Sequence, residues 1–152
     1  MRVSAKVDYA VRAGAELAAA AGSGPVKGDT IAQAQKIPLK FLENILLDLK
    51  HAGLVQSQRG AEGGYWLAKE PSTISVADVI RAVEGPIANV RGDRPEQVEY
   101  AGAAEALREV WIAVRGNLRA VLETVTLADV AAGELPDDVR RIAADPDAWL
   151  PH

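Results

Sequence analysis

Hydrophobic positions at helical spacing predict two helices in the first 35 residues of the chain. The first runs from about Ser4 to Ala21, and the Gly-Ser-Gly-Pro segment directly after it is typical of a helix end. The second is short, from Ile31 to Gln35, with Asp29 or Thr30 as its N-cap. A tight turn at residues 36–37 is expected to follow it.

The clearest helical pattern lies at residues 38–51, where apolar residues follow an i, i+3, i+4, i+7 stripe. Pro38 falls in the first turn, a position that accepts proline, and Gly53 follows the last periodic residue as a helix-ending glycine. A short helix, a tight turn and a longer helix predict a helix-turn-helix. The stripe consists of Leu42, Ile45, Leu46 and Leu49.

Two short runs with strand character follow, at residues 54–57 and 64–67, and a glycine-rich tip at residues 58–63 joins them. We interpret Gly63 and Gly64 as serving strand geometry rather than ligand contact. Helix, turn, helix and hairpin in this order predict a winged helix-turn-helix.

A long helix is the main element predicted in the second half. Ser75 opens an S-x-x-D capping box and a helix that ends near residues 84–86, and residues 87–102 lack a clean period and are expected to form a loop. Residues 103–124 then form a helix whose apolar residues follow the a/d spacing of a coiled coil. They are Leu107, Trp111, Val114, Leu118, Val121 and Val125.

A helix of about 22 residues is roughly 33 Å long, more than the small preceding domain easily covers. We therefore expect part of the seam to meet a second copy of the chain, with a plain core helix as the alternative. Thr126 caps a further short helix at residues 127–132, residues 133–136 break the chain, and an acidic tail follows. In that tail Ile142, Trp149 and Leu150 are expected to pack back onto the body.

The expected fold class is thus mostly α with a small β-hairpin wing. Its expected divisions are a winged helix-turn-helix domain at residues 1–85, a loop at 86–102, a dimerisation helix with a short capping helix at 103–132, and the tail at 133–152. Hydrophobic residues make up 49% of the 152 residues and charged residues 25%, which is typical of a soluble globular protein. The first residues lack the apolar region of a secretory signal, so a cytoplasmic location is expected.

The chain has no cysteine, which excludes a disulfide, a cysteine-ligated zinc or iron–sulfur site and a thiol nucleophile. Its two histidines are His51 and the last residue, so a histidine metal site or a catalytic triad has little to use. No phosphate-cradling glycine loop stands beside a lysine and a hydroxyl residue. We expect neither an enzyme nor a metal.

Charge is divided unevenly along the chain. Residues 1–69 hold nine Lys and Arg against six Asp and Glu, whereas residues 70–152 hold eight against fifteen. All six lysines lie in the first part. The asymmetry suggests different partners for the two parts, although an excess of three positive charges can also arise by chance.

Several motifs, in this order and spacing, resemble those of the Rrf-type family of bacterial winged-helix regulators, which includes IscR, NsrR and CymR. The resemblance extends from about Met1 to Ala132. It implies a homodimer held by the long helix, with two recognition helices and two wings facing a pseudo-palindromic operator in double-stranded DNA. The motifs are Ala10–Ala13, Ile37–Glu43, Ala52–Val55, Arg59-Gly60, Gly63–Tyr65, Ile74–Pro86 and Thr126–Asp129.

The start of the third helix is expected to enter the major groove, where Lys40, Glu43 and Asn44 suit base edges. The resemblance places Glu43 and Asn44 where relatives read bases, and a solvated helix residue is the alternative for Glu43. Arg59 with Gly60 at the wing tip suits a narrow minor groove, against a plain hairpin turn. The candidate DNA-binding residues are Lys36, Pro38, Lys40, Phe41, Glu43, Asn44, Arg59 and Gly60.

Several relatives hold an iron–sulfur cluster through three cysteines in the loop before the long helix, and this loop has none, so no cofactor is expected. Three possibilities for an effector remain open: a small molecule bound between the body and the long helix, a docking protein, or no effector at all. Loop residues that could line such a pocket are Arg91, Arg94, Glu96, Glu99 and Tyr100. Two functions remain: a sequence-specific DNA-binding repressor, or a winged-helix module that docks a partner protein. The lysine bias and Arg59 favour the first.

Overall fold

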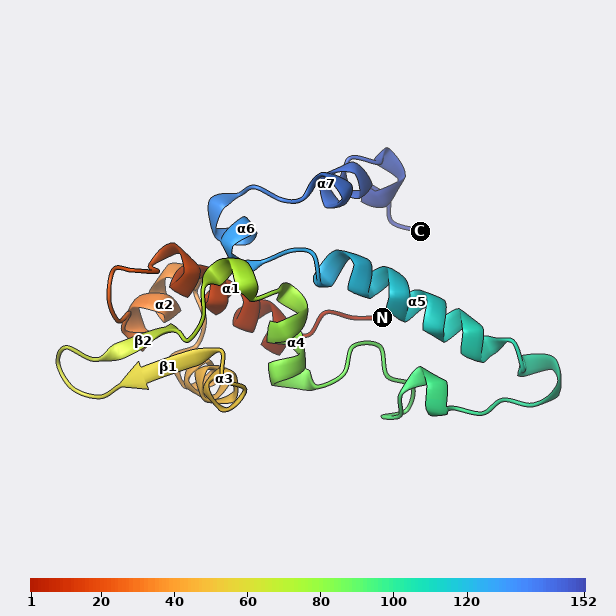
Figure 1. The fold of residues 1–152 in the computed structure, drawn as a ribbon, viewed down its shortest axis with the longest axis horizontal. Helices are drawn as coiled ribbons and strands as arrows, with labels where there is room; N and C mark the ends of the chain where they lie inside the picture. Colours follow the sequence, from red (N-terminus) through yellow and green to blue (C-terminus); the bar gives the residue numbers. More distant parts are fainter.

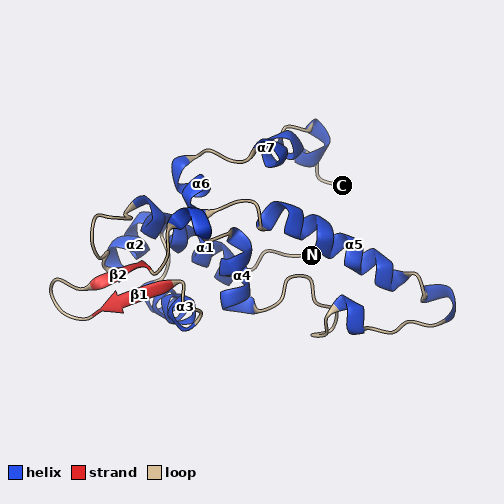
Figure 2. Cartoon of the chain, in the orientation of Figure 1, coloured by secondary structure: helices blue, strands red, loops and turns tan.

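The computed structural model describes residues 1–152 as a helical body with a two-stranded hairpin and one long helix that extends away from it (Figures 1 and 2). The fold class expected from the sequence is confirmed. None of the helices combines the length and apolar character that crossing a membrane requires. The elements are α1 (Ala5–Ala19), α2 (Gly28–Gln35), α3 (Leu39–His51), β1 (Val55–Gln58), β2 (Gly64–Leu67), α4 (Val76–Glu84), α5 (Leu107–Leu122), α6 (Leu127–Ala132) and α7 (Asp137–Ala143).

The core lies where α1, α3, α4 and α6 meet, and we call these helices, α2 and the hairpin the body. All four residues of the predicted α3 stripe are at most 1% exposed. Burying a large aliphatic side chain stabilises a fold by about 1.5–3 kcal/mol, so this stripe holds α3 firmly against the body. From α1 the core receives Val7, Ala10, Ala13 and Leu17.

The helix-turn-helix begins earlier than its pattern suggested. Lys27 is the N-cap of α2 and makes no side-chain cap hydrogen bond, so Asp29 and Thr30 lie inside the first turn. The prediction that one of them caps the helix is wrong, because an acidic residue is as favourable in the first turn as at the cap. The predicted turn is confirmed at Lys36, which has the left-handed φ of 53°. Pro38 is the N-cap of α3 rather than part of its first turn.

The hairpin is antiparallel, with Val55 opposite Leu67 and Gln58 opposite Gly64. The first strand therefore lies one residue later than the pattern indicated. A third segment joins it, because Val26 exchanges two backbone hydrogen bonds of 2.8 and 2.7 Å with Tyr65. This pairing fixes the hairpin to the connection between α1 and α2, and so sets the angle of the wing relative to the helix-turn-helix.

The glycines after the wing tip are buried, and neither leaves room for a side chain. A Cβ on Gly63 would lie 2.1 Å from the carbonyl oxygen of Gln58, and one on Gly64, whose φ is +150°, would lie 2.6 Å from that of Val26. Distances this short require the backbone to move. Gly63 and Gly64 thus serve the close approach of strands, in line with the sequence interpretation.

We expect Gly63→Ala to lower the free energy of unfolding by about 2 kcal/mol, because the new methyl group meets backbone that cannot rotate away. Urea denaturation measures this directly. Gly116→Ala is the matched control: nothing lies within 4 Å of a Cβ there, and an alanine inside α5 should stabilise by about 0.5–1 kcal/mol. Equal stability of Gly63→Ala and the parent would contradict the packing described.

Two capping boxes lie side by side, at the starts of α4 and α6. Ser75 and Asp78 open α4, and Thr126 and Asp129 open α6, as the sequence predicted for α4 and, in its Thr126 cap, for α6. Backbone hydrogen bonds of 2.9 Å join Val76 to Val125 and Leu127 to Ile74. The short helix, which the sequence grouped with the long one, thus packs onto the body.

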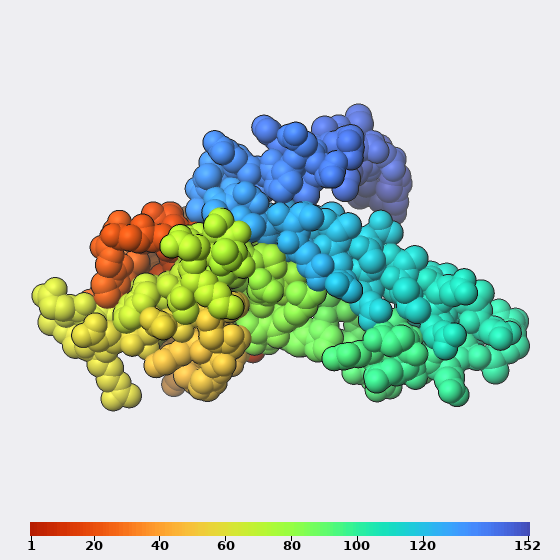
Figure 3. All heavy atoms as spheres, viewed as in Figure 1, coloured from red at the N-terminus to blue at the C-terminus, as the bar shows by residue number.

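Helix α5 is shorter than expected. Residues 102–104 form a separate 3₁₀ turn, and the helix ends at Leu122, so its 16 residues span about 24 Å. With the preceding loop it forms an arm that projects from the body (Figure 3). The loop lies along the helix: the Trp111 indole donates to the Tyr100 hydroxyl at 2.9 Å, and Arg115 pairs with Glu96 at 2.5 Å.

The C-terminal tail forms α7 and a 3₁₀ turn at residues 146–149. Ile142, Trp149 and Leu150 are 56%, 77% and 59% exposed, so the expectation that they pack back onto the body is wrong. The indole of Trp149 donates instead to the Ala143 carbonyl at 2.6 Å. The tail folds on itself because its apolar residues are too few to cover a second surface.

Candidate nucleic-acid interface

Helix α3 and the wing enclose a surface groove of about 530 Å³, which we call the α3–wing groove. Glu43 and Asn44 line it from α3, and Arg59 and Gly60 line it from the wing tip. These residues are exposed, so their polar groups are free to meet a ligand. The structure brings four of the eight predicted DNA-binding residues onto one surface.

The other four lie outside the groove, at the turn between α2 and α3 and in the first turn of α3. Lys36, Pro38 and Lys40 are exposed there. Phe41 is 42% exposed and packs edge-on against Tyr9 of α1, with ring centroids 5.6 Å apart. A side chain held in this way can support a sugar or phosphate contact at the edge of a bound duplex, but it cannot reach into the groove.

Two lysines that the sequence analysis did not select also line the groove. The Lys27 ammonium donates to the carbonyl of Gly60 at 2.7 Å, and the Lys50 ammonium donates to the Ser57 hydroxyl at 2.9 Å. Both bonds fasten the wing to the helices. Because the wing folds back across positions distant in sequence, only the overall bias of lysines toward the first 69 residues indicated them.

The charged residues that line the groove are Lys27, Lys50 and Arg59 against Glu43. A concave surface with an excess of positive charge attracts a phosphate backbone. The N-terminus of α2 opens at the same place, since Lys27 leaves its first amide groups without a side-chain cap. Backbone amides at a helix N-terminus are ready donors to phosphate oxygens.

Arg12 of α1 holds the end of α2 against α1. Its guanidinium donates to the carbonyl of Gln35, the last residue of α2, at 2.6 Å, and pairs with Asp8 at 2.9 Å. It also lies 4.8 Å from the ring centre of Tyr9, which packs on Phe41. These contacts hold the turn before α3 at a fixed place on α1. The sequence offered Arg12 only as part of a family motif.

The residues of the predicted dimer seam lie on α5 and, for Val125, just after its end, away from this groove. Leu107, Trp111, Val114, Leu118 and Val121 are half-buried by their own chain, and Val125 is 6% exposed beside the start of α4. Val110, which widens the stripe, is 48% exposed. Val110 is therefore the residue on this side of α5 that its own chain leaves most open.

The chain matches the family described as "Rrf2: Iron-dependent Transcriptional regulator" over residues 3–133. It is 50% identical over 145 residues to a Mycobacterium tuberculosis protein named as an HTH-type transcriptional regulator, covering 95% of this chain and 90% of that protein. It is 39% identical over 132 residues to the HTH-type transcriptional regulator CymR of Bacillus subtilis, covering 87% of this chain and 91% of CymR.

Solved structures agree with these matches. The structure of CymR, described as the global cysteine regulator of B. subtilis, superposes with a TM-score of 0.75 at 38% identity, covering 88% of this chain and 98% of that one. IscR of T. potens superposes with a TM-score of 0.69 at 34% identity, covering 100% of this chain and 93% of that one.

The iron in the family description has no fitting site here. The chain has no cysteine, and no group of three His, Cys, Asp or Glu residues is placed to hold a metal ion. Iron–sulfur clusters are held by cysteine thiolates, so these residues do not suit one.

Proposed function

The chain belongs to the Rrf2 family of helix-turn-helix transcriptional regulators, and on this premise we propose that it represses transcription as a homodimer on a pseudo-palindromic operator. The family consists of DNA-binding regulators and not of enzymes. In this proposal the protein acts in the cytoplasm, without an iron–sulfur cluster.

The observation that carries the proposal is the α3–wing groove. Asn44 and Glu43 present their polar groups on the same surface as Arg59 and Lys27. Asparagine pairs with adenine and glutamate accepts from cytosine in the major groove, while an arginine at a wing tip suits the narrow minor groove beside it. One surface thus combines base reading, minor-groove reading and phosphate contact.

A palindromic operator requires a protein with matching two-fold symmetry. Val110, Val114 and Val121 give α5 an apolar strip that its own chain leaves open in part. We propose that a second α5 covers this strip. The reading unit is then residues 1–85 with α6, and the dimer element is α5.

The first test is selection of bound sequences from a random DNA pool with the purified, metal-free full chain at near-physiological salt. We expect an inverted repeat. Asn44→Ala should lose the preference for adenine at one position of each half-site, a change of about 1–3 kcal/mol in discrimination. Gln97→Ala, at an exposed amide outside the groove, should select the parent sequence.

No enriched sequence from the parent chain would contradict operator reading and favour the alternative of a winged helix that docks a partner protein. If Asn44→Ala selects the same inverted repeat as the parent, the proposal of operator reading stands. Asn44 then takes no part in base recognition.

A further inference from the structure

A second polar cavity lies far from the α3–wing groove, where α4, the loop after it and α5 meet. Its volume is about 480 Å³, and Ile87 is its one hydrophobic lining residue. Such a cavity suits a charged ligand rather than an apolar one. Four arginines line it: Arg81 from α4, Arg94 from the loop, and Arg115 and Arg119 from α5. We call it the four-arginine pocket.

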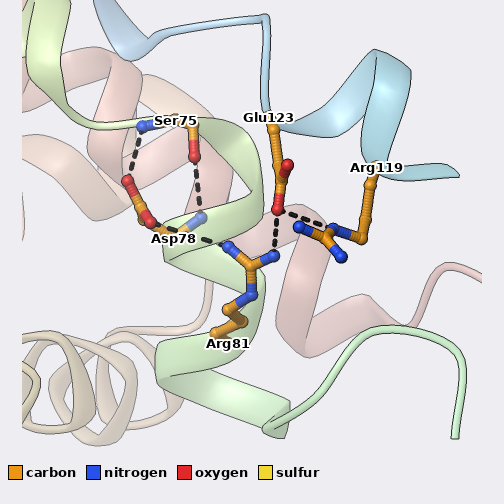
Figure 4. A network of polar contacts seen from close by, with 5 residues as sticks. All are labelled: Ser75, Asp78, Arg81, Arg119 and Glu123. Carbon is orange, nitrogen blue, oxygen red and sulfur yellow. Dashed lines mark hydrogen bonds and ion pairs between the residues drawn. The ribbon is translucent and has the colours of Figure 1, made fainter. Parts of the chain in front are cut away.

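Carboxylates of the same chain neutralise these arginines only in part. Glu123 accepts from Arg81 and, at 2.9 Å, from Arg119, so one carboxylate serves two guanidinium groups (Figure 4). Asp78 lies 3.8 Å from Arg81, which is too far for a hydrogen bond. Each guanidinium carries five N–H donors, and this network leaves most of them unused.

Arg94 is the arginine without a partner. No carboxylate lies within 4.0 Å of it, whereas the neighbouring Glu96 pairs with Arg115 at 2.5 Å. The pocket therefore combines four guanidinium groups with one lining carboxylate, and an excess of one positive charge remains when Glu123 and Asp78 are counted as well. A guanidinium fork matches the two oxygens of a carboxylate or phosphate group.

Two carboxyl groups beside the pocket have a lowered pKa. Hydrogen bonds from Arg81 and then Arg119 lower the pKa of Glu123. The pKa of Glu96 is lowered by a backbone hydrogen bond at Glu96 and next by the hydrogen bond from Arg115. Hydrogen bonds from arginines of the pocket thus help to keep both carboxyl groups ionised.

The loop that carries Arg94 has a defined shape. Val90 and Asp93 exchange backbone hydrogen bonds of 2.8 and 2.9 Å around a tight turn at Arg91 and Gly92, whose φ values are 54° and 90°. A non-glycine residue in this region is uncommon, so the turn has a specific backbone conformation. The turn places Arg94 opposite α5 and directs the loop across the pocket.

We propose that the four-arginine pocket binds a small organic anion with two or more carboxylate or phosphate groups, and that this anion is the effector of the regulator. The second part rests on the proposed function, since it needs α5 to join two reading units. Arg81 belongs to the body and Arg119 to α5, and Glu123 is the group that now joins them. An anion that takes over either guanidinium changes how α5 is held, and so changes the spacing of the two reading units.

Calorimetric titration of the full chain tests the binding directly. Citrate and pyrophosphate, in separate titrations at constant ionic strength, distinguish a carboxylate ligand from a phosphate ligand, and acetate serves as the single-charge probe. We expect one citrate or pyrophosphate per chain and no saturable binding of acetate. Arg94→Gln should weaken binding about tenfold, because it removes a charge-assisted contact and breaks no ion pair.

Arg91→Gln is the matched control: it removes the same charge from the same loop, and Arg91 does not line the pocket. It should bind the probe as the parent does. Equal weakening in both variants would show attraction by overall charge and would overturn the site. So would a lack of saturation by either probe up to about 10 mM, well above the affinity of a specific pocket.

The regulatory part is tested with the selected operator. We expect the bound anion to change operator affinity at least about fivefold in the parent and in Arg91→Gln, and not in Arg94→Gln, as is typical of allosteric coupling. An anion that binds without changing operator affinity would overturn the effector role, and the pocket would stand as an anion-binding site only. A pocket that binds anions in a chain that selects no operator would instead show that the proposed function fails.

Discussion

Replacing Val110 with glutamate is expected to convert the proposed dimer to a monomer and to lower operator affinity about 100-fold, since each half-site is then bound separately. Val110 is 48% exposed on α5, beside Val114 and Val121, so the variant chain keeps its own fold. In the dimer the new carboxylate would be buried without a partner, which strongly opposes association. Sedimentation equilibrium and operator titration measure the two effects.

Ile112→Glu is the control for this prediction. Ile112 is 38% exposed and lies two residues along the helix from Val110, about 160° around its axis. This variant should remain dimeric and bind as the parent does. Trp111→Glu is a poorer choice, because the Trp111 indole donates to Tyr100 and its loss would also release the loop. A dimeric Val110→Glu protein would show that the copies meet elsewhere.

Arg59→Ala is expected to lower operator affinity about 10- to 30-fold and to remove the preference for A·T-rich flanks. Arg59 is exposed at the wing tip and makes no ion pair, so its loss leaves the hairpin intact. A narrow minor groove concentrates negative potential, and an arginine there gains more on A·T-rich sequence than on mixed sequence. Titration against operators with A·T-rich and G·C-rich flanks measures both changes.

Lys69→Ala removes the same charge outside the α3–wing groove and serves as the control. It should change affinity little, and equally for both flanks. If Arg59→Ala weakened both operators by the same factor, Arg59 would be a phosphate contact rather than a minor-groove reader. Unchanged affinity would remove it from the interface.

Features that depend on residues a few positions apart were predictable from the sequence. The α3 stripe needed only helical periodicity, and the capping box at Ser75 needed only residues three apart. The fold class followed from the order of these elements. The start of α2 was misplaced because Asp29 and Thr30 suit both a cap and a first turn, so local chemistry does not choose between them.

Features that depend on distant contacts were not predictable. No pattern in the residues around Val26 indicates that it pairs with Tyr65, and none around Leu127 indicates that it packs beside Gly14. The candidate interface divides in the same way. Asn44 and Arg59 stand in recognisable motifs, whereas Lys27 and Lys50 reach the groove only because the wing folds back over the helices.

The pairing of the two capped helices has a consequence for how this chain can change over evolutionary time. The chain leaves the body at the end of α4 and returns beside its beginning, where Val125 meets Val76. Exit and return are separated by the nine residues of α4, about 14 Å. The arm is therefore an insertion between two points of the folded body that lie close together. The length and the residues of the arm can diverge between relatives while the DNA-binding body keeps its packing. The same body can then respond to different signals.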